Sequence, residues 1–159
     1  MFVWLFHMYS IEVSQMPADK HFSDLINMYS AAPINQMYNP TLQIFEGKAI
    51  LEIALGQHLH HSAGAVHGSV YFKMLDDAAF FAANSLEREF FVLTTSFTTY
   101  LTRPVSAGIM RAIGQVVNAN KSQFIVESIV YDEQEREIGR GSGIFVRGKF
   151  PLLEADGYA

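Results

Sequence analysis

An apolar stretch of about 18 residues, 68–85, restricts the fold of this chain more than any other feature. Its polar side chains are few, chiefly Lys73, Asp76, Asp77 and Asn84. A helix that is apolar on nearly every side is buried on nearly every side. A carboxylate in such a helix loses hydration, so it needs polar partners or its pKa rises. Because structure alone rarely requires this, Asp76 and Asp77 are the first candidates for function.

The segments on both sides of this helix have the two-residue alternation and composition of strands. Before it, residues 41–46 and 48–57 predict a hairpin around Gly47. After it, four further strands are predicted, at residues 91–100, 109–117, 124–131 and 138–146. An antiparallel sheet around one long central helix is an α+β arrangement. Gly139, Gly141 and Gly143 leave one face of the last strand bare, so we expect the helix or another chain to cover it.

The length of 159 residues predicts one domain with a sizeable core. We divide the chain into an N-terminal arm with a short helix (1–34), the main domain (35–150) and a C-terminal tail (151–159). Amphipathic spacing places the short helix near residues 17–28. The tail after Pro151 is expected to be loosely held.

The first eight residues are mostly apolar but much shorter than the ~20 residues of a membrane span. They also lack a basic segment and a cleavage site, unlike a signal peptide. We interpret them as an arm that packs on a partner, or as residues upstream of a start at Met8 or Met16. A membrane anchor is the weakest of the three alternatives.

Composition excludes several functional classes. The formal net charge of −5 disfavours nucleic acid as a partner. The absence of cysteine excludes disulfides, a thiol nucleophile and a zinc–thiolate site. It is consistent with a reducing cytoplasm, where we expect the protein to act. We expect no membrane partner.

One motif spans the start and middle of the long helix. His67-Gly68-Ser69 is followed by Asp76, nine positions after the histidine, and by Ala78. This motif resembles that of the hotdog-fold acyl-CoA thioesterases of the phenylacetate-degradation type. The segment 100–105, Tyr-Leu-Thr-Arg-Pro-Val, resembles the end of a strand in the same family. The resemblance extends over about residues 35–147.

The resemblance implies a hotdog fold and hydrolysis of a small to medium or aromatic acyl-CoA. Within this scheme Asp76 is a general base or a nucleophile. The helix N-terminus at Gly68 polarises the thioester carbonyl through backbone N–H groups. Gly68 and Asp76 are eight residues apart, which is ~12 Å along a helix and too far for one carbonyl. The resemblance implies a homodimer with antiparallel helices, or a dimer of such dimers, in which Asp76 faces the partner's helix N-terminus.

Two positions depart from the family pattern. Ser69 stands where the second glycine is usual, and it is still small enough for a ligand to approach. His61 stands where many members carry an asparagine that helps to hold the carbonyl. A histidine can donate one hydrogen bond from the same place.

Asp77 competes with Asp76 for the catalytic role. Adjacent helical side chains point about 100° apart, so we do not expect both in one site. Lys73 is within reach of either carboxylate. We expect Lys73 to pair with Asp77 on a wetter side of the helix, which leaves Asp76 in the cleft. The alternative is that both aspartates are structural.

The remaining candidates come from the strands and loops. The resemblance places a hydroxyl that steadies the attacking water near Thr94, with Thr95 almost as suitable, although both could be ordinary strand residues. His67 is interpreted as an orienting residue of the loop, with acid–base catalysis as the alternative. Phosphates of coenzyme A would rest on basic residues. Candidates for that contact are Arg103, Arg111 and Lys121.

The candidate catalytic residues are therefore Asp76, Gly68, His67, His61 and Thr94, and the candidate substrate contacts are Ser69, Thr95 and Arg103. The histidines near residues 58–67 raise a metal site as an alternative. No helical His-Glu-x-x-His motif or nearby acidic ligand supports it, so we expect no metal and no cofactor. Two other functions stay open: a non-catalytic acyl or acyl-CoA binding protein on the same fold, and a hotdog dehydratase.

Overall fold

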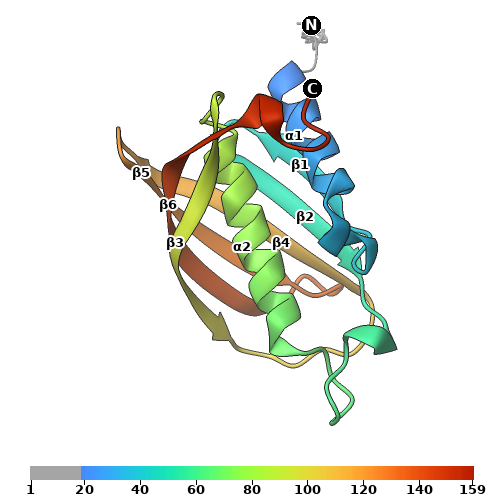
Figure 1. Cartoon of the computed structure of the whole chain (residues 1–159). Helices are drawn as coiled ribbons and strands as arrows, with labels where there is room; N and C mark the ends of the chain where they lie inside the picture. The colour runs from blue at the N-terminus through green and yellow to red at the C-terminus, as the bar shows by residue number, and fades with distance from the viewer. Residues whose placement is uncertain (1–18) are drawn as a thin grey trace, which may run out of the picture.

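The computed structural model describes residues 19–159, and the predictions for the first eighteen residues lie outside this range. Figure 1 shows one long helix against a curved sheet. The helices are α1 (Lys20–Ala31), η1 (Pro33–Gln36), η2 (Gln57–Leu59), α2 (Gly68–Asn84) and η3 (Leu152–Glu154). The strands are β1 (Thr41–Phe45), β2 (Lys48–Ala54), β3 (Phe90–Leu101), β4 (Ile109–Ala119), β5 (Gln123–Tyr131) and β6 (Glu137–Pro151).

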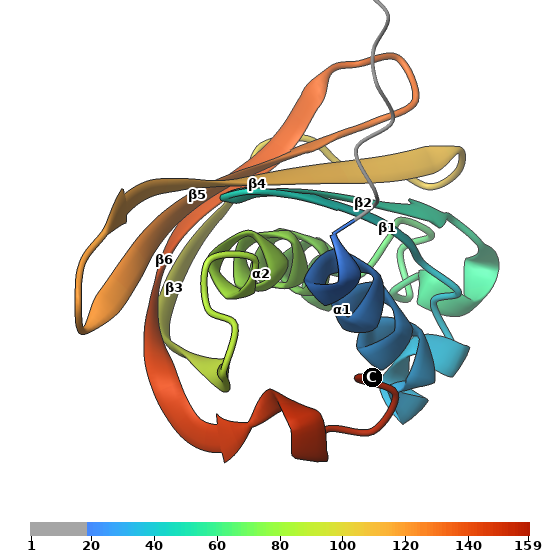
Figure 2. The same ribbon diagram turned by 90° about the horizontal axis from the view of Figure 1, so that it is seen from above.

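The six strands form one antiparallel sheet in the order β1-β2-β4-β5-β6-β3. Figure 2 shows this sheet curving around α2, with α1 beside α2 on the concave side. The predicted α+β class and hotdog architecture are confirmed. The short helix begins at Lys20, later than predicted, because Asp19 caps it by accepting the His21 backbone N–H at 3.0 Å. None of the helices within residues 19–159 is long and apolar enough to cross a membrane.

Small residues let α2 lie directly on the sheet. A Cβ atom on Gly114 of β4 would lie 2.3 Å from the carbonyl oxygen of Ala78, so only glycine fits there. Ala78, Ala79, Ala82 and Ala83 of α2 are completely buried. The apolar sequence of α2 is thus explained by burial against the sheet on one side and by α1, which lies beside it, on another.

The bare face of β6 is covered differently from our expectation. The ring of Phe97, on the neighbouring strand β3, lies over Gly141 and Gly143, where an added Cβ on either glycine would come within 2.4 Å of it. Phe97 then meets Phe72 of α2 edge to face, with ring centroids 5.8 Å apart. The helix therefore reaches the middle of β6 through an aromatic side chain of an adjacent strand.

The prediction of a loosely held C-terminal tail is wrong. Leu152 is fully buried, and the Tyr158 hydroxyl lies 2.7 Å from Nδ1 of His21 on α1. His21 Nε2 lies 2.9 Å from the carbonyl oxygen of Asn84, so its ring joins α1, the end of α2 and the tail. Burial lowers the pKa of His21. Its neutral form then donates from Nε2 to the carbonyl and accepts the tyrosine proton at Nδ1.

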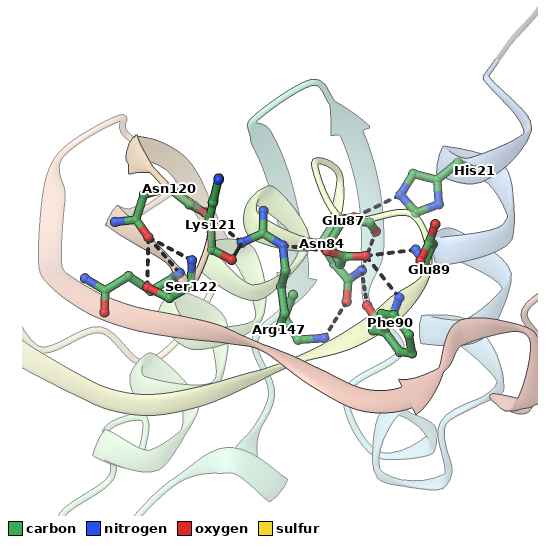
Figure 3. Close-up of polar contacts among 11 residues, drawn as sticks. His21, Asn84, Glu87, Glu89, Phe90, Asn120, Lys121, Ser122 and Arg147 are labelled. Atoms are coloured by element: carbon green, nitrogen blue, oxygen red, sulfur yellow. Dashed lines mark hydrogen bonds and ion pairs between the residues drawn. The ribbon is translucent and has the colours of Figure 1, made fainter.

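A polar network fixes the turn from α2 into β3 (Figure 3). The Asn84 amide donates to the Glu87 carbonyl at 2.9 Å and accepts the Val92 N–H at 3.0 Å. The Glu87 carboxylate accepts from Arg147 Nε at 2.8 Å, and the Arg147 guanidinium stacks over Phe124 at 4.4 Å. These contacts give hydrogen-bond partners to the buried side chains of Asn84 and Glu87. They also hold the backbone at the start of β3, through the bond from Val92 N–H to Asn84.

We predict that His21 makes stability depend on pH. The folded-state pKa of His21 lies below its ordinary 6.5, so its contribution is complete above pH 6.5 and is lost as pH falls through the lowered value. His21→Gln should be less stable than the wild type at pH 7.5, and this difference should shrink toward pH 5. Urea unfolding at several pH values measures it. A constant difference across this range would contradict the prediction.

Candidate active site

Asp76 lies midway along α2, half-buried at the wall of a cavity of about 190 Å³. The cavity lies between α1 and η1 on one side and α2 and the start of β3 on the other. Its lining residues are Met28, Tyr29, Ala32, Ile34, Asn35, Lys73, Asp76, Asp77, Phe80, Phe81 and Phe91. Burial raises the pKa of Asp76 to about 6, against the opposing effect of a hydrogen bond from Thr94. A carboxylate with a pKa in this range can gain and lose a proton near neutral pH.

Thr94, not Thr95, contacts Asp76. Its hydroxyl donates to Asp76 Oδ1 at 3.1 Å. Thr95 donates instead to the carbonyl oxygen of Ile144 on β6, at 3.0 Å. The pairing of β3 with β6 shifts register between Thr94 and Ser96, and this irregularity turns the two threonines to different partners. The sequence alone left this choice open.

Asp77 is held by two donors on the same oxygen. Lys73 Nζ lies 2.5 Å and the Tyr29 hydroxyl 2.6 Å from Asp77 Oδ2. The predicted pairing of Lys73 with Asp77 is confirmed. The lysine nitrogen is also placed 5.2 Å from the centre of the Tyr38 ring.

The surroundings of this pair differ from the prediction. The side chains of Lys73 and Asp77 are only 12% and 20% exposed, so this side of α2 is largely shielded from water. Asp77 also lines the same cavity as Asp76. The reason is that α1 packs along α2 and closes a cavity that spans two faces of the helix. The predicted division of the chain places α1 in an arm outside the main domain.

Gly68 lies at a second cavity, of about 320 Å³. Its lining residues are His61, Val66, Gly68, Tyr71, Leu101, Thr102, Arg103 and Pro104. Gly68 and Asp76 of one chain therefore line different cavities, as the length of the helix between them requires.

His67 caps the first turn of α2. Its Nδ1 accepts the Ser69 backbone N–H at 3.1 Å and lies 2.8 Å from the Ser69 hydroxyl, while its carbonyl accepts the Val70 N–H at 3.0 Å. Within residues 19–159, the Gly68 N–H has no such partner. These contacts agree with an orienting role for His67. They leave the Gly68 N–H free to donate to a ligand.

His61 and Arg103 also face the second cavity. His61 Nδ1 accepts the Ala63 N–H at 3.1 Å, so the neutral ring carries its proton on Nε2 and can donate from there. The Arg103 carbonyl accepts the Tyr71 hydroxyl at 3.0 Å, which anchors the Arg103 segment to α2.

The other predicted phosphate contacts lie elsewhere. Arg111 is paired with Glu135 and lies 5.6 Å from the Tyr131 ring centre, and Lys121 belongs to the turn before β5. Neither residue lines either cavity. In the part of the chain from residue 19 onward, no group of three or more histidine, aspartate or glutamate side chains could hold a metal ion.

The sequence does not predict the wall that α1 and η1 contribute to the Asp76 cavity. Tyr29 meets Phe81 edge to face at 4.8 Å, and Phe80 packs on Phe91 at 4.9 Å, so aromatic side chains line much of the cavity. The apolar face of α1 was a signal that it covers something. Nothing in the sequence indicated that its partner is α2.

Comparisons with known proteins agree with this architecture. Residues 63–138 match the sequence profile of the Thioesterase superfamily. No curated protein matches the chain. The E. coli PaaI protein, from the phenylacetic acid degradation operon, superposes with a TM-score of 0.76 at 18% identity, over 83% of this chain and 96% of its own. A thioesterase family protein from Silicibacter pomeroyi superposes with a TM-score of 0.73 at 20% identity, over 80% and 99%.

A conserved protein from Pseudomonas aeruginosa gives a TM-score of 0.70 at 19% identity, over 83% of this chain and all of its own, 100%. The likeness in fold thus extends well beyond the segment that matches the family profile. The chain has the hotdog fold of these proteins, and its segment 63–138, which carries both Gly68 and Asp76, matches the Thioesterase superfamily.

Proposed function

We propose that this protein hydrolyses acyl-CoA thioesters as a homodimer, with a site at each end of the two-fold interface. The observation that carries the proposal is Asp76, a half-buried carboxylate with a raised pKa, held by Thr94 beside an apolar cavity. The superfamily match over residues 63–138 supports the same reaction. The histidine–glycine–aspartate motif supports the phenylacetate-degradation type within that superfamily.

In this mechanism Asp76 takes a proton from water, and the water oxygen attacks the thioester carbonyl carbon. Attack by the carboxylate itself, followed by hydrolysis of the anhydride, is the alternative route. Negative charge that develops on the carbonyl oxygen is stabilised by two donors of the partner chain, the Gly68 N–H and the Nε2–H of His61, which line one cavity. The C–S bond then breaks, Asp76 returns its proton to the leaving sulfur, and the products are a carboxylic acid and the thiol of coenzyme A.

The proposed interface uses β3 and α2. β3 is an edge strand of the sheet and carries exposed apolar side chains, among them Leu93, Tyr100 and Leu101. Phe72 of α2 is exposed on this side as well, next to Phe97 of β3. An exposed apolar edge strand is a surface that another chain can cover. Antiparallel pairing of two β3 strands would bring Asp76 of one chain toward Gly68 of the other, and such dimers could pair further into tetramers.

The cavities suggest how the substrate divides between them. The Asp76 cavity, at about 190 Å³, is of the size that holds a compact acyl group; an apolar cavity of about 150 Å³ binds benzene. A small to medium or aromatic acyl group therefore fits there. We assign the coenzyme A end to the Gly68 cavity of the partner chain, where Arg103 can meet a phosphate and Ser69 leaves room for approach.

Substitution of the two adjacent aspartates gives opposite results in this account. Asp76→Asn should lower kcat/KM about 10²–10⁴-fold, the usual contribution of a general base. Asp77→Asn is the matched control, and it should keep kcat within about tenfold while losing about 1–3 kcal/mol of stability, because Lys73 loses its partner. Release of free thiol from a panel of short, medium and aromatic acyl-CoAs measures the activity of both variants. Urea unfolding measures the loss of stability in Asp77→Asn.

An Asp76→Asn variant with full activity would end the assignment of Asp76. Tight binding of acyl-CoA by the wild type without turnover would instead favour the non-catalytic binding function.

Stability offers a separate test of Asp76. Its folded-state pKa is raised to about 6, so the carboxyl is best tolerated when protonated, and stability is lost as pH rises from about 4 through 6. Asp76→Asn should therefore be more stable than the wild type at pH 8 and equal to it near pH 4. The difference at pH 8 should be about 1–2 kcal/mol, less than the full pKa shift implies, because water partly screens the half-buried carboxylate. A variant that is less stable at pH 8 would show that the carboxylate serves the fold.

The pH dependence of activity should report the same group. We expect kcat/KM to rise with pH to a plateau, with an inflection near 6. Because the Thr94 hydroxyl lowers the pKa of Asp76, Thr94→Val should move the inflection to higher pH. Thr95→Val, whose hydroxyl donates to a backbone carbonyl, should leave it in place. If Thr94→Val leaves the inflection in place, the group that titrates in the activity profile is not Asp76.

A further inference from the structure

A shielded ion pair lies in the wall of the Asp76 cavity. Lys73 Nζ is 2.5 Å from Asp77 Oδ2, and both side chains are largely buried. In the described part of the chain, Asp76 is the only other charged residue that lines this cavity. Burial of an ion pair costs hydration that the attraction between its charges often only offsets, so stability alone is a weak reason for such a pair. Its place beside the candidate base suggests a role in the site.

Aromatic side chains fix the position of the lysine. Its Nζ lies 5.4 Å from the centre of the Tyr29 ring and 5.2 Å from the centre of the Tyr38 ring. The Tyr29 hydroxyl donates to Asp77 at 2.6 Å, on the same oxygen that Lys73 contacts. Tyr29 belongs to α1, and Tyr38 follows η1. The segments that cover α2 therefore hold a positive charge at a defined place in the cavity wall.

This charge is close enough to act on Asp76. Lys73 is three residues before Asp76, and residues with this spacing lie on the same side of a helix, with Cβ atoms about 5–6 Å apart. Burial is the largest effect on the pKa of Asp76 and raises it; among the neighbouring charges, Asp77 raises it further and Lys73 lowers it. The hydroxyl of Thr94 on β3 is neutral. So is that of Tyr29, because burial raises the pKa of Tyr29 far above its ordinary value.

We propose that Lys73 is a positioning residue for the general base. Its ammonium group offsets the charge of Asp77, so that Asp76 can be negatively charged at neutral pH and accept the proton of the attacking water. Without a cation at this place, two adjacent carboxylates would repel each other in a wall that is shielded from water. This inference rests on the proposed function, because it takes Asp76 as the base. Lys73 contacts no reacting atom in this scheme.

The test measures the inflection in the pH profile of kcat/KM for three variants. In Asp77→Asn the charge of Lys73 acts alone, so the inflection should fall by about 1 pH unit. In Lys73→Met the charge of Asp77 is no longer offset, so the inflection should rise. In the double variant both charges are absent, and the inflection should return close to that of the wild type.

The matched control is Lys20→Met. Lys20 forms the same kind of pair with an aspartate four residues later, Asp24, but its side chain is 76% exposed and lies outside the cavity. Its removal should leave the inflection in place. A merely structural Lys73 would likewise change stability without moving the inflection.

Two results would each overturn the proposal. One is an inflection that Lys73→Met does not raise. The other is the same inflection in Asp77→Asn and in the double variant, which differ only at Lys73. Each comparison decides alone, so the proposal stays testable if one single variant does not fold. If the wild type hydrolyses no thioester, the proposed function fails instead. Titration of the Asp76 carboxyl by NMR, with its signal identified by its loss in Asp76→Asn, then decides the role of Lys73 by the same two criteria.

Discussion

The contact between α2 and the sheet at Gly114 is the constraint on which the rest of the structure depends. The helix backbone can come this close only because β4 has no side chain there and α2 presents alanines. Close packing lets the sheet curve around the helix and bury it. A carboxylate in the middle of that helix is then partly removed from water, which is why the pKa of Asp76 rises to about 6.

The second layer of cover makes two neighbouring carboxylates chemically different. α1 lies along α2, and the C-terminal segment is fastened to α1 through Tyr158 and His21. Through this layer Tyr29 reaches Asp77 and, with Lys73, supplies it with two donors. Among residues 19–159, Asp76 receives a hydrogen bond only from the Thr94 hydroxyl, so burial dominates its pKa. Adjacent groups with different environments are a common basis for dividing structural and acid–base roles.

The sequence predicted the central helix and all six strands because their signals are local: an apolar run, two-residue alternation and turn residues. It also indicated the pairing of Lys73 with Asp77, which helical spacing dictates. It did not reveal that α1 and the tail close a cavity over α2, because those contacts join segments far apart in the chain. The choice between Thr94 and Thr95 depended on a register shift.

The central claim is that each site combines Asp76 of one chain with the helix N-terminus of the other. Gly68→Pro removes that N–H; proline suits a first helical position, and His67, with φ −64° and ψ 142°, can precede it. Gly68→Pro and Asp76→Asn should each be nearly inactive. When equal amounts of the two variants are mixed and exchange subunits, half of the dimers are mixed, and each mixed dimer has one intact site of its two. Activity should therefore return to about a quarter of wild type. Activity that stays at the level of the separate variants would contradict the shared site.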